Sequence, residues 1–357
     1  VYLNDRRLGD NEGYFFPQEY EVTGILRGKN TLLVEVDCPN EEDKARKTMI
    51  TGVFSHWDAL DPETNPGGIW LPVEIVRSGE VYVKHSRLSV TELSEDSVAR
   101  VACRVVLEAQ ASTSVELRIS LTPHNFEGDG QIFHKEVELS PGSNVVEVPL
   151  VVEEPHLWWT HDQGFPHLYR VSVEVTTAGS KTPSDKVEFN YGLRTFEMRD
   201  WTAYLNGRRL FIKGNNYGPG DSRIATMNRE RYRRDLELAR DANMNMLRLH
   251  AHVEHPTFYE AADELGMLIW QDFPLQWSYS KEVLPEALRQ LELMVNHLYN
   301  HPAVAIWCMH NEPGIQPESE NGRRRWIART LFSLLFYNWD RDQMDKQLKR
   351  RAEELDE

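Results

Sequence analysis

The sequence predicts a multidomain protein, with two all-β sandwiches followed by the first half of an eight-stranded α/β barrel. Three observations support this prediction. Strand-like segments fill the chain up to about residue 190, strand-like and helical segments alternate after residue 194, and only four such strand–helix units fit before residue 357. Alternating strands and helices indicate parallel strands joined by crossover helices. A complete barrel takes about 250 residues, whereas roughly 160 are present here.

Residues 1–85 are expected to form part of a β-sandwich. The segments YLNDRRL, TLLVEV, IWLPVEIV and EVYVKH cluster or alternate β-branched residues between turns that contain Gly, Asn or Pro. Three or four strands are too few for a closed sandwich, and Val1 already lies within a strand-like segment. We therefore expect this domain to lack its beginning.

Residues 86–193 are predicted to form an immunoglobulin-like β-sandwich. Apolar residues occupy every second position along two stretches, which contain Val101, Cys103, Val105 and Leu107, and then Val115, Leu117, Ile119 and Leu121. The runs NVVEVPLVV and LYRVSVEVTT continue the series. Several strands of this spacing over about a hundred residues are typical of that fold, although the Cys–Trp–Cys pattern of antibody domains is absent.

Residues 194–357 are predicted to form the N-terminal half of a (β/α)8 catalytic barrel. The expected strands are LFIKGNN, NMLRLHA, MLIWQDF and AVAIWCM, and the expected helices span residues 228–242, 255–266, 284–300, 326–337 and 345–355. Asn228 is a suitable N-cap residue, and Gly266 is a suitable residue to end a helix. On this interpretation the chain stops halfway around the barrel.

Composition excludes several classes of protein. Forty Lys and Arg against 56 Asp and Glu give a net charge of −16, which repels nucleic acid and anionic membrane surfaces. No apolar run approaches the roughly 20 residues of a membrane span. The three cysteines, Cys38, Cys103 and Cys308, are few and far apart, so they do not form a disulfide framework and favour a cytoplasmic location.

The most informative segment is HPAVAIWCMHNEP, residues 301–313. Its apolar run from 303 to 309 is typical of a parallel strand that is buried on both faces. The polar residues His310, Asn311 and Glu312 follow at the carboxyl end of that strand, where α/β barrels carry their catalytic residues. A carboxyl group beside an amide can donate a proton while the amide holds the substrate.

Seven segments, taken in order, resemble glycoside hydrolase family two, which contains β-galactosidases, β-glucuronidases and β-mannosidases. They are NPGGIWLPVEI, PHLWWTHDQGFPHLYRVSVEV, YGLRTFEM, LFIKGNNYGPGDS, NMNMLRLH, FYEAADELGMLIWQDF and NHPAVAIWCMHNEP. The first resembles the closing segment of the family's sugar-binding jelly roll, so residues 1–85 are expected to be a partial jelly-roll domain. The second resembles the family's segment in the immunoglobulin-like domain, and the last four resemble the first four barrel strands.

The resemblance implies a retaining exo-β-glycosidase that acts on a β-galactoside, β-mannoside or β-glucuronide. Glu312 takes the place of the family's general acid/base, and Asn311 that of its partner, which binds the 2-hydroxyl of the sugar. The family's nucleophile is a Glu at the end of the seventh strand, so no nucleophile is assigned in this chain. By itself the chain is therefore expected to be inactive. No organic cofactor is implied, and a structural or assisting metal ion would leave no readable pattern.

Further substrate-binding candidates lie at the ends of the other strands. They are Arg248 and His250 on the second, Asp272 on the third, and Asn216, with Asn215, on the first. Trp277, in the polar loop QWSYS, could stack on a pyranose ring, whereas Trp270 and Trp307 are expected in the core. His250 falls where mannosidase-like members carry Trp, WQDF resembles the mannosidase branch, and NEP resembles the galactosidase and glucuronidase branch.

Two alternatives remain open at this point. His250, His252 and His255 could bind zinc in a metal-dependent hydrolase, although a His-x-His pair of that kind normally belongs to the first barrel strand. Alternatively, the chain could be a catalytically incomplete fragment that binds carbohydrate or supports assembly. A half barrel exposes strand edges and apolar faces, so a homo-oligomer or a complementing C-terminal fragment is expected.

Overall fold

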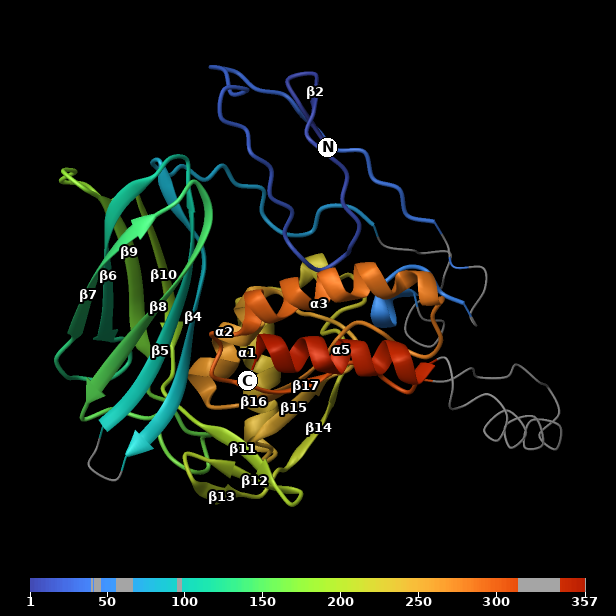
Figure 1. Ribbon diagram of the computed structural model, residues 1–357. Helices are drawn as coiled ribbons and strands as arrows, with labels where there is room; N and C mark the ends of the chain where they lie inside the picture. The colour runs from blue at the N-terminus through green and yellow to red at the C-terminus, as the bar shows by residue number, and fades with distance from the viewer. Residues whose placement is uncertain (40, 42–45, 56–66, 95–97, 314–340, 357) are drawn as a thin grey trace.

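The computed structural model describes residues 1–39, 41, 46–55, 67–94, 98–313 and 341–356. Figure 1 shows a β-sandwich standing beside a layer of helices and a parallel sheet, while the N-terminal segments form long loops next to α3 (Leu284–Leu298). The helix predicted at residues 326–337 lies outside the described residues. Among the described helices, none combines the length and the apolar character that a membrane crossing requires.

The N-terminal part holds less regular structure than the sequence predicts. A small antiparallel sheet contains β1 (Tyr2–Leu3), β2 (Arg6–Arg7) and β3 (Leu32–Leu33), and a 3-10 helix, η1, spans Gly52–Ser55. The predicted strand at residues 69–76 is not formed: within the described chain it pairs with no strand, and Val76 is 83% exposed. An isolated extended segment has no partner to complete its backbone hydrogen bonds, so its β-branched residues do not by themselves make a strand.

The sandwich consists of two antiparallel sheets. One contains β4 (Val81–Ser94), β5 (Val98–Ala109) and β8 (Gly142–Glu153); the other contains β6 (Thr113–Pro123), β7 (Gln131–Leu139), β9 (Tyr169–Thr177) and β10 (Asp185–Tyr191). The predicted alternation is confirmed, because Cys103 on β5 and Leu117 on β6 are fully buried between the sheets. β4 runs without a break through the expected boundary at residues 85 and 86, so the segment EVYVKH contributes to this sandwich.

A fully buried tryptophan fixes the sandwich against the barrel. The indole of Trp158 donates a 2.8 Å hydrogen bond to the carbonyl of Asp263 in α2 (Pro256–Leu265), and its own carbonyl accepts one from Asn206. Asn206 follows β12 (Thr202–Leu205) in a three-stranded meander with β11 (Phe196–Arg199) and β13 (Arg208–Leu210). Gly192 leaves room for this indole, since a Cβ there would lie only 2.7 Å from the Cβ of Trp158.

Four parallel strands in consecutive order form the barrel part. They are β14 (Gly214–Tyr217), β15 (Met246–Leu249), β16 (Leu268–Asp272) and β17 (Val304–Cys308), and the segments between them contain η3 (Ile224–Thr226), α1 (Arg229–Asp241), α2, η4 (Lys281–Val283) and α3. The last described helix is α5 (Arg341–Leu355). Both predicted helix ends are confirmed: the Asn228 side chain accepts from the Arg231 amide, and Gly266 adopts a left-handed conformation with φ 65°.

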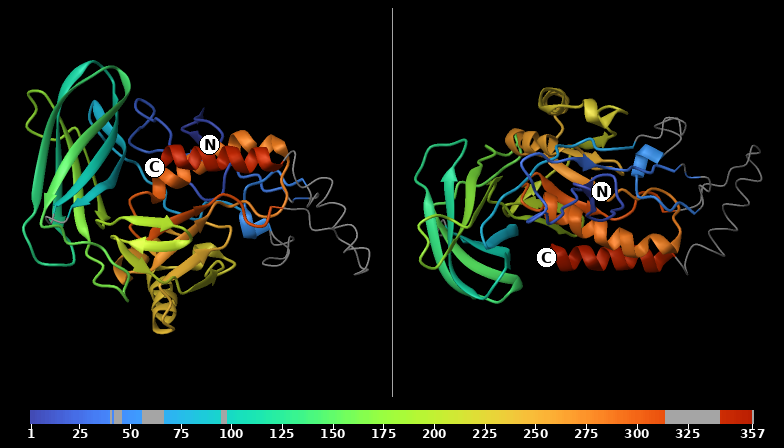
Figure 2. Two further views of the ribbon diagram at one scale, coloured as in Figure 1. Left: turned by 60° about the horizontal axis from the view of Figure 1, so that its bottom comes forward. Right: turned by 90° about the horizontal axis from the view of Figure 1, so that it is seen from above.

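The two faces of this sheet differ in burial. Leu249, Ile269 and Gln271 point toward the helices and are fully buried, whereas Arg248, Trp270 and Ile306 on the opposite face remain partly exposed. Side chains alternate between the faces of a strand, so the second set occupies the face that a closed barrel turns inward. α3 and α5 lie side by side (Figure 2). The fold is thus a partial TIM barrel that follows sandwich domains, as the sequence predicts.

Candidate active site

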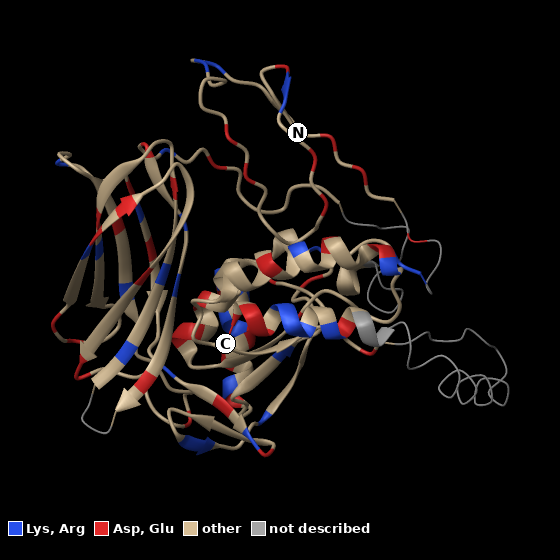
Figure 3. Ribbon diagram, in the orientation of Figure 1, with Lys and Arg blue, Asp and Glu red and all other residues tan. Residues whose placement is uncertain are grey.

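The carboxyl ends of the four parallel strands bring the predicted site residues to one edge of the sheet. Residues in register across the strands include Asn216 with Arg248, and Asp272 with Cys308. The loops that follow β16 and β17 meet there, because Gln276 and Asn311 form a parallel bridge. Charged residues of both signs are interspersed over the rest of the described chain (Figure 3), so the site is identified by its contacts rather than by a single-sign surface.

A buried network connects the ends of β15, β16 and β17. Arg248 donates from Nε and Nη2 to the two carboxylate oxygens of Asp272, at 2.9 and 2.8 Å, and from Nη2 to Oδ1 of Asn311 at 2.7 Å. Asp272 is fully buried and also accepts from the Ala251 amide at 3.1 Å. Burial by itself would lower the pKa of the Arg248 guanidinium. The hydrogen bonds and the negative charge of Asp272 outweigh this effect, so the pKa is raised.

Glu312 projects at the exposed edge of this network. Its Oε2 accepts a 3.2 Å hydrogen bond from the indole N–H of Trp277. The two loops are also tied through their backbones, since the Trp277 amide donates to the Asn311 carbonyl at 3.1 Å and the Asn311 amide donates to the Leu275 carbonyl at 2.9 Å. The carboxyl group of Glu312 is therefore held in a defined direction although its side chain faces solvent.

Three residues other than glycine adopt left-handed backbone conformations around this edge. They are Ala251, Trp277 and Glu312, with φ of 50°, 67° and 45°. Each such conformation costs on the order of 1–3 kcal/mol and persists only where the surroundings enforce it, and such residues gather at functional sites. Three of the ten non-glycine residues with positive φ in the described chain thus lie around this edge.

Asp345 is a neighbour of the site that the sequence patterns did not indicate, and it contacts His310 at the end of β17. His310 bridges the two sides of the site, because its Nε2 lies 2.8 Å from the Trp277 carbonyl and its Nδ1 lies 2.8 Å from Oδ1 of Asp345 in α5. The sequence shows His310 next to Asn311, but it gives no signal that a residue 35 positions later completes the contact. α5 therefore helps to position the loop that carries Trp277.

The buried histidine after β15 contacts neighbouring protein groups. His252 is fully buried, with Nδ1 3.0 Å from the His250 carbonyl and Nε2 3.1 Å from Oε1 of Glu254. Glu254 also accepts from the Tyr232 hydroxyl and the Gly220 amide. In the part of the chain that the structure describes, no group of three or more His, Cys, Asp or Glu side chains is placed to hold a metal ion. His250 stays half-buried, and burial lowers its pKa despite the opposing charge of Asp272.

The remaining candidates lie at the margins. Asn215 and Asn216 are exposed at β14, and Oδ1 of Asn215 accepts from the Asn216 amide at 2.9 Å. Trp270 and Trp307 pack against the barrel core, and the indole of Trp307 donates to Asp356 at 2.6 Å. These two rings therefore pack against the core, whereas Trp277 contacts Glu312.

A segment of the N-terminal part docks beside the site, which sequence periodicity could not reveal. The Lys47 amide donates to the Ser278 carbonyl at 3.3 Å, and the Ser280 amide donates to the Lys47 carbonyl at 2.9 Å. The buried Lys47 ammonium donates to the Tyr279 hydroxyl at 3.3 Å and lies 4.4 Å from the centre of that ring. The Val53 amide donates to the Ala251 carbonyl at 3.2 Å. The N-terminal part thus contacts the strained residue Ala251 and the loop that carries Trp277.

Lys47 provides a pH test of this docking. Burial, partly offset by the charge of Glu41, lowers the pKa of the ammonium to about 8 from its ordinary value of 10.5. Below pH 8 the Lys47 amine is protonated in both the folded and the unfolded protein, so the folded protein bears the full cost of burying the charge. Between pH 8 and 10.5 only the unfolded protein binds this proton. The stability of the wild type therefore rises with pH over this range. We expect Lys47→Met to be more stable than wild type at pH 7 by on the order of 1–3 kcal/mol, with the difference shrinking by pH 10.

Urea denaturation of both proteins from pH 6 to 10.5 measures this difference. Lys84→Met is the matched control, because the Lys84 side chain is 48% exposed in an ion pair with Glu108, and its effect should stay within about 0.5 kcal/mol at every pH. A Lys47→Met protein that is less stable than wild type at pH 7 would show that the contacts with Tyr279 outweigh the burial cost.

This combination of domains matches known proteins. Two family models match: "Glycosyl hydrolases family 2" over residues 81–194 and "Glycosyl hydrolases family 2, TIM barrel domain" over residues 196–327. A mannosylglycoprotein endo-beta-mannosidase of Lilium longiflorum is 28% identical over 90% of this chain and 38% of its own length. Among solved structures, a beta-D-mannosidase from Dictyoglomus thermophilum matches with a TM-score of 0.75 and 22% identity over 94% of this chain and 46% of that one.

A Bacteroides uniformis beta-glucuronidase matches with a TM-score of 0.63 and 22% identity over 78% of this chain and 34% of that one. The chain thus spans less than half the length of each of these three proteins. The two family models meet at the link between the sandwich and the barrel, in the order that the structure shows. The chain belongs to the glycosyl hydrolases of family 2.

Proposed function

We propose that the whole protein is a retaining exo-β-glycosidase in which Glu312 is the general acid/base. The observation that carries this proposal is the placement of Glu312 at the carboxyl edge of the parallel sheet, held by the indole of Trp277. Catalytic residues of α/β barrels occupy this edge. The strained backbone at Ala251, Trp277 and Glu312 supports the same assignment.

In the proposed reaction, the Glu312 carboxylic acid gives its proton to the oxygen of the leaving group while a second carboxylate attacks the anomeric carbon. A retaining enzyme holds these two carboxyl groups about 5–5.5 Å apart. The Glu312 carboxylate then takes a proton from water, which attacks the glycosyl-enzyme and releases the sugar. We assign no nucleophile within this chain, and we propose that the chain alone does not turn over substrate.

Arg248 and Asp272 are proposed to position the site. The expectation that Asp272 contacts substrate is revised, because its carboxylate is fully buried and is occupied by Arg248 and the Ala251 amide. Arg248 in turn fixes Oδ1 of Asn311, and no described group accepts a hydrogen bond from the buried Nδ2 of that amide. A buried donor without a partner needs an explanation, and a sugar hydroxyl would supply one.

Carbohydrate contacts are proposed for the exposed margin of the site, which Asn216, His250 and Trp277 form. Asn216 lies in register with Arg248, and Trp277 already contacts the acid/base carboxyl. Aromatic rings match the apolar C–H face of a pyranose, while amide and imidazole groups can bond its hydroxyls. The relative from Lilium bears a mannosidase name, so β-mannosides are the first substrates to test.

The experiment is a panel of p-nitrophenyl β-glycosides offered to this chain and to its longer gene product. The panel contains the mannoside, glucuronide, galactoside, glucoside and glucosaminide, and Glu312→Gln in the longer product controls for contaminating hydrolases. We expect the longer product to hydrolyse one of them, with this chain and the control both inactive. Turnover by this chain alone would contradict the missing nucleophile, and a longer product that binds sugar without cleaving any glycoside would favour a carbohydrate-binding role.

A further inference from the structure

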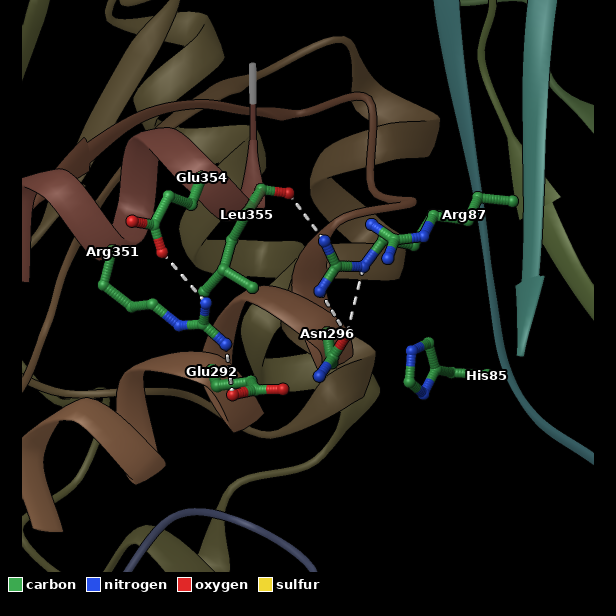
Figure 4. Close-up of a pocket in the computed structure, with 8 residues that line it drawn as sticks. His85, Arg87, Glu292, Asn296, Arg351, Glu354 and Leu355 are labelled. Carbon is green, nitrogen blue, oxygen red and sulfur yellow. Dashed lines mark hydrogen bonds and ion pairs between the residues drawn. The ribbon is translucent and has the colours of Figure 1, made fainter. Parts of the chain in front are cut away.

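A polar cavity of about 160 Å³ lies where the sandwich meets α3 and α5 (Figure 4). Strands β4 and β5 contribute three of its basic residues, His85, Arg87 and Arg104. The two helices contribute a fourth, Arg351, together with Glu292, Asn296, Glu354 and Leu355. None of these residues belongs to the candidate active site described above. The cavity is therefore a separate feature of the junction between the sandwich and the barrel.

Two arginines of the cavity lie beside each other on neighbouring strands. Arg87 on β4 and Arg104 on β5 are direct partners in the antiparallel register, and like charges at such positions repel each other. Arg87 is buried, and its guanidinium donates to Oδ1 of Asn296 and, at 2.6 Å, to the Leu355 carbonyl (Figure 4). Among the described residues, neither arginine donates to a carboxylate, so their repulsion is not offset by an ion pair.

The acidic residues of the cavity are already engaged. Arg351 donates to Oε2 of Glu292 at 2.7 Å and to Oε2 of Glu354 at 3.0 Å. The residues that line the cavity include three guanidinium groups and two carboxylates, so the lining carries one net positive charge. Burial and the charge of Arg87 lower the pKa of His85 to about 4, so near pH 7 its ring adds a polar group but no charge.

We propose that this cavity binds a small oxyanion between the guanidinium groups of Arg87 and Arg104. Guanidinium groups present several N–H donors in a planar fork that suits phosphate and carboxylate oxygens. A cavity of this size holds several water molecules, so a phosphate ion fits in place of some of them. The bound anion would balance the net positive charge of the lining and link the sandwich to α3 and α5.

Isothermal titration of inorganic phosphate into the chain, at constant ionic strength with chloride as the balancing anion, tests the proposal. Arg104→Gln is the informative variant, because Arg104 is exposed at the rim and its loss should leave the fold intact. Arg100→Gln is the matched control: it lies on the same strand, is 59% exposed and pairs with Glu92, so the variant removes the same charge. Circular dichroism checks that both variants are folded.

We expect one phosphate per chain, unchanged affinity in Arg100→Gln, and binding that is about tenfold to a hundredfold weaker in Arg104→Gln, as the loss of a charge-assisted hydrogen bond implies. Parallel titrations with sulfate and with acetate show whether the site takes a tetrahedral oxyanion or a carboxylate. The proposal is overturned if wild type binds none of the three anions, or if Arg104→Gln and Arg100→Gln bind them equally.

Discussion

Replacement of Asp272 by alanine should destabilise the protein by about 3 kcal/mol. The fully buried carboxylate accepts two hydrogen bonds from Arg248 and one from the Ala251 amide, and its removal leaves a largely buried guanidinium without its counter-ion. Breaking a buried pair in this way costs about 3–5 kcal/mol. We expect the lower end because the Arg248 side chain keeps 26% of its surface exposed. Chemical denaturation measures the change in the free energy of unfolding.

Two further variants test whether the loss of stability comes from the unpaired Arg248 guanidinium or from the removal of any acidic side chain. Glu92→Ala removes one partner of an exposed ion pair with Arg100 and should cost less than about 1 kcal/mol. The double variant Asp272→Leu with Arg248→Met replaces the pair by apolar side chains and should recover much of the loss. A single Asp272→Ala variant that is no less stable than Glu92→Ala would contradict the positioning role assigned to this carboxylate.

Much of the fold could be predicted because local signals and tertiary structure agree. The period-two pattern of β5 and β6 matches their burial between two sheets, and Asn228 and Gly266 stand at real helix ends. The strand predicted at residues 69–76 is not formed, because its β-branched residues lie in extended chain without a neighbouring strand. Strand formation depends on pairing with distant residues, which propensity does not encode.

The residues at the strand ends of the site could be predicted from the sequence, but the contacts that hold them in place could not. Strand order places Arg248, Asp272 and Asn311 at one edge, so their meeting follows from the βαβ pattern. Lys47 reaches the loop after β16 across more than 200 residues, and Asp345 reaches His310 from α5. Such long-range contacts have no periodic signal in the sequence. The distinction between a residue that binds substrate and one that positions a neighbour, as for Asp272, likewise needs the observed burial.

Replacement of Glu312 by alanine in the longer gene product should lower hydrolysis of a poorly activated β-glycoside about 10²- to 10⁴-fold, which is the usual contribution of a general acid/base. The acid is needed because an alkoxide leaves poorly without a proton. An activated leaving group such as 2,4-dinitrophenolate departs unassisted, so formation of the glycosyl-enzyme should change little with that substrate. Glu282→Ala is the control, because Glu282 is an exposed acid in η4 and its loss should leave both rates unchanged.

The measurement that tests the central assignment most directly is azide rescue of this Glu312→Ala enzyme. Without its base the enzyme should accumulate the glycosyl-enzyme, and azide, which needs no proton removed, should attack the anomeric carbon and displace the enzyme's carboxylate. We predict a burst of 2,4-dinitrophenolate, acceleration by azide and a β-glycosyl azide product with retained configuration. Full activity of Glu312→Ala toward an unactivated glycoside, or equal losses for activated and unactivated substrates with no rescue by azide, would contradict the assignment of Glu312 as the acid/base.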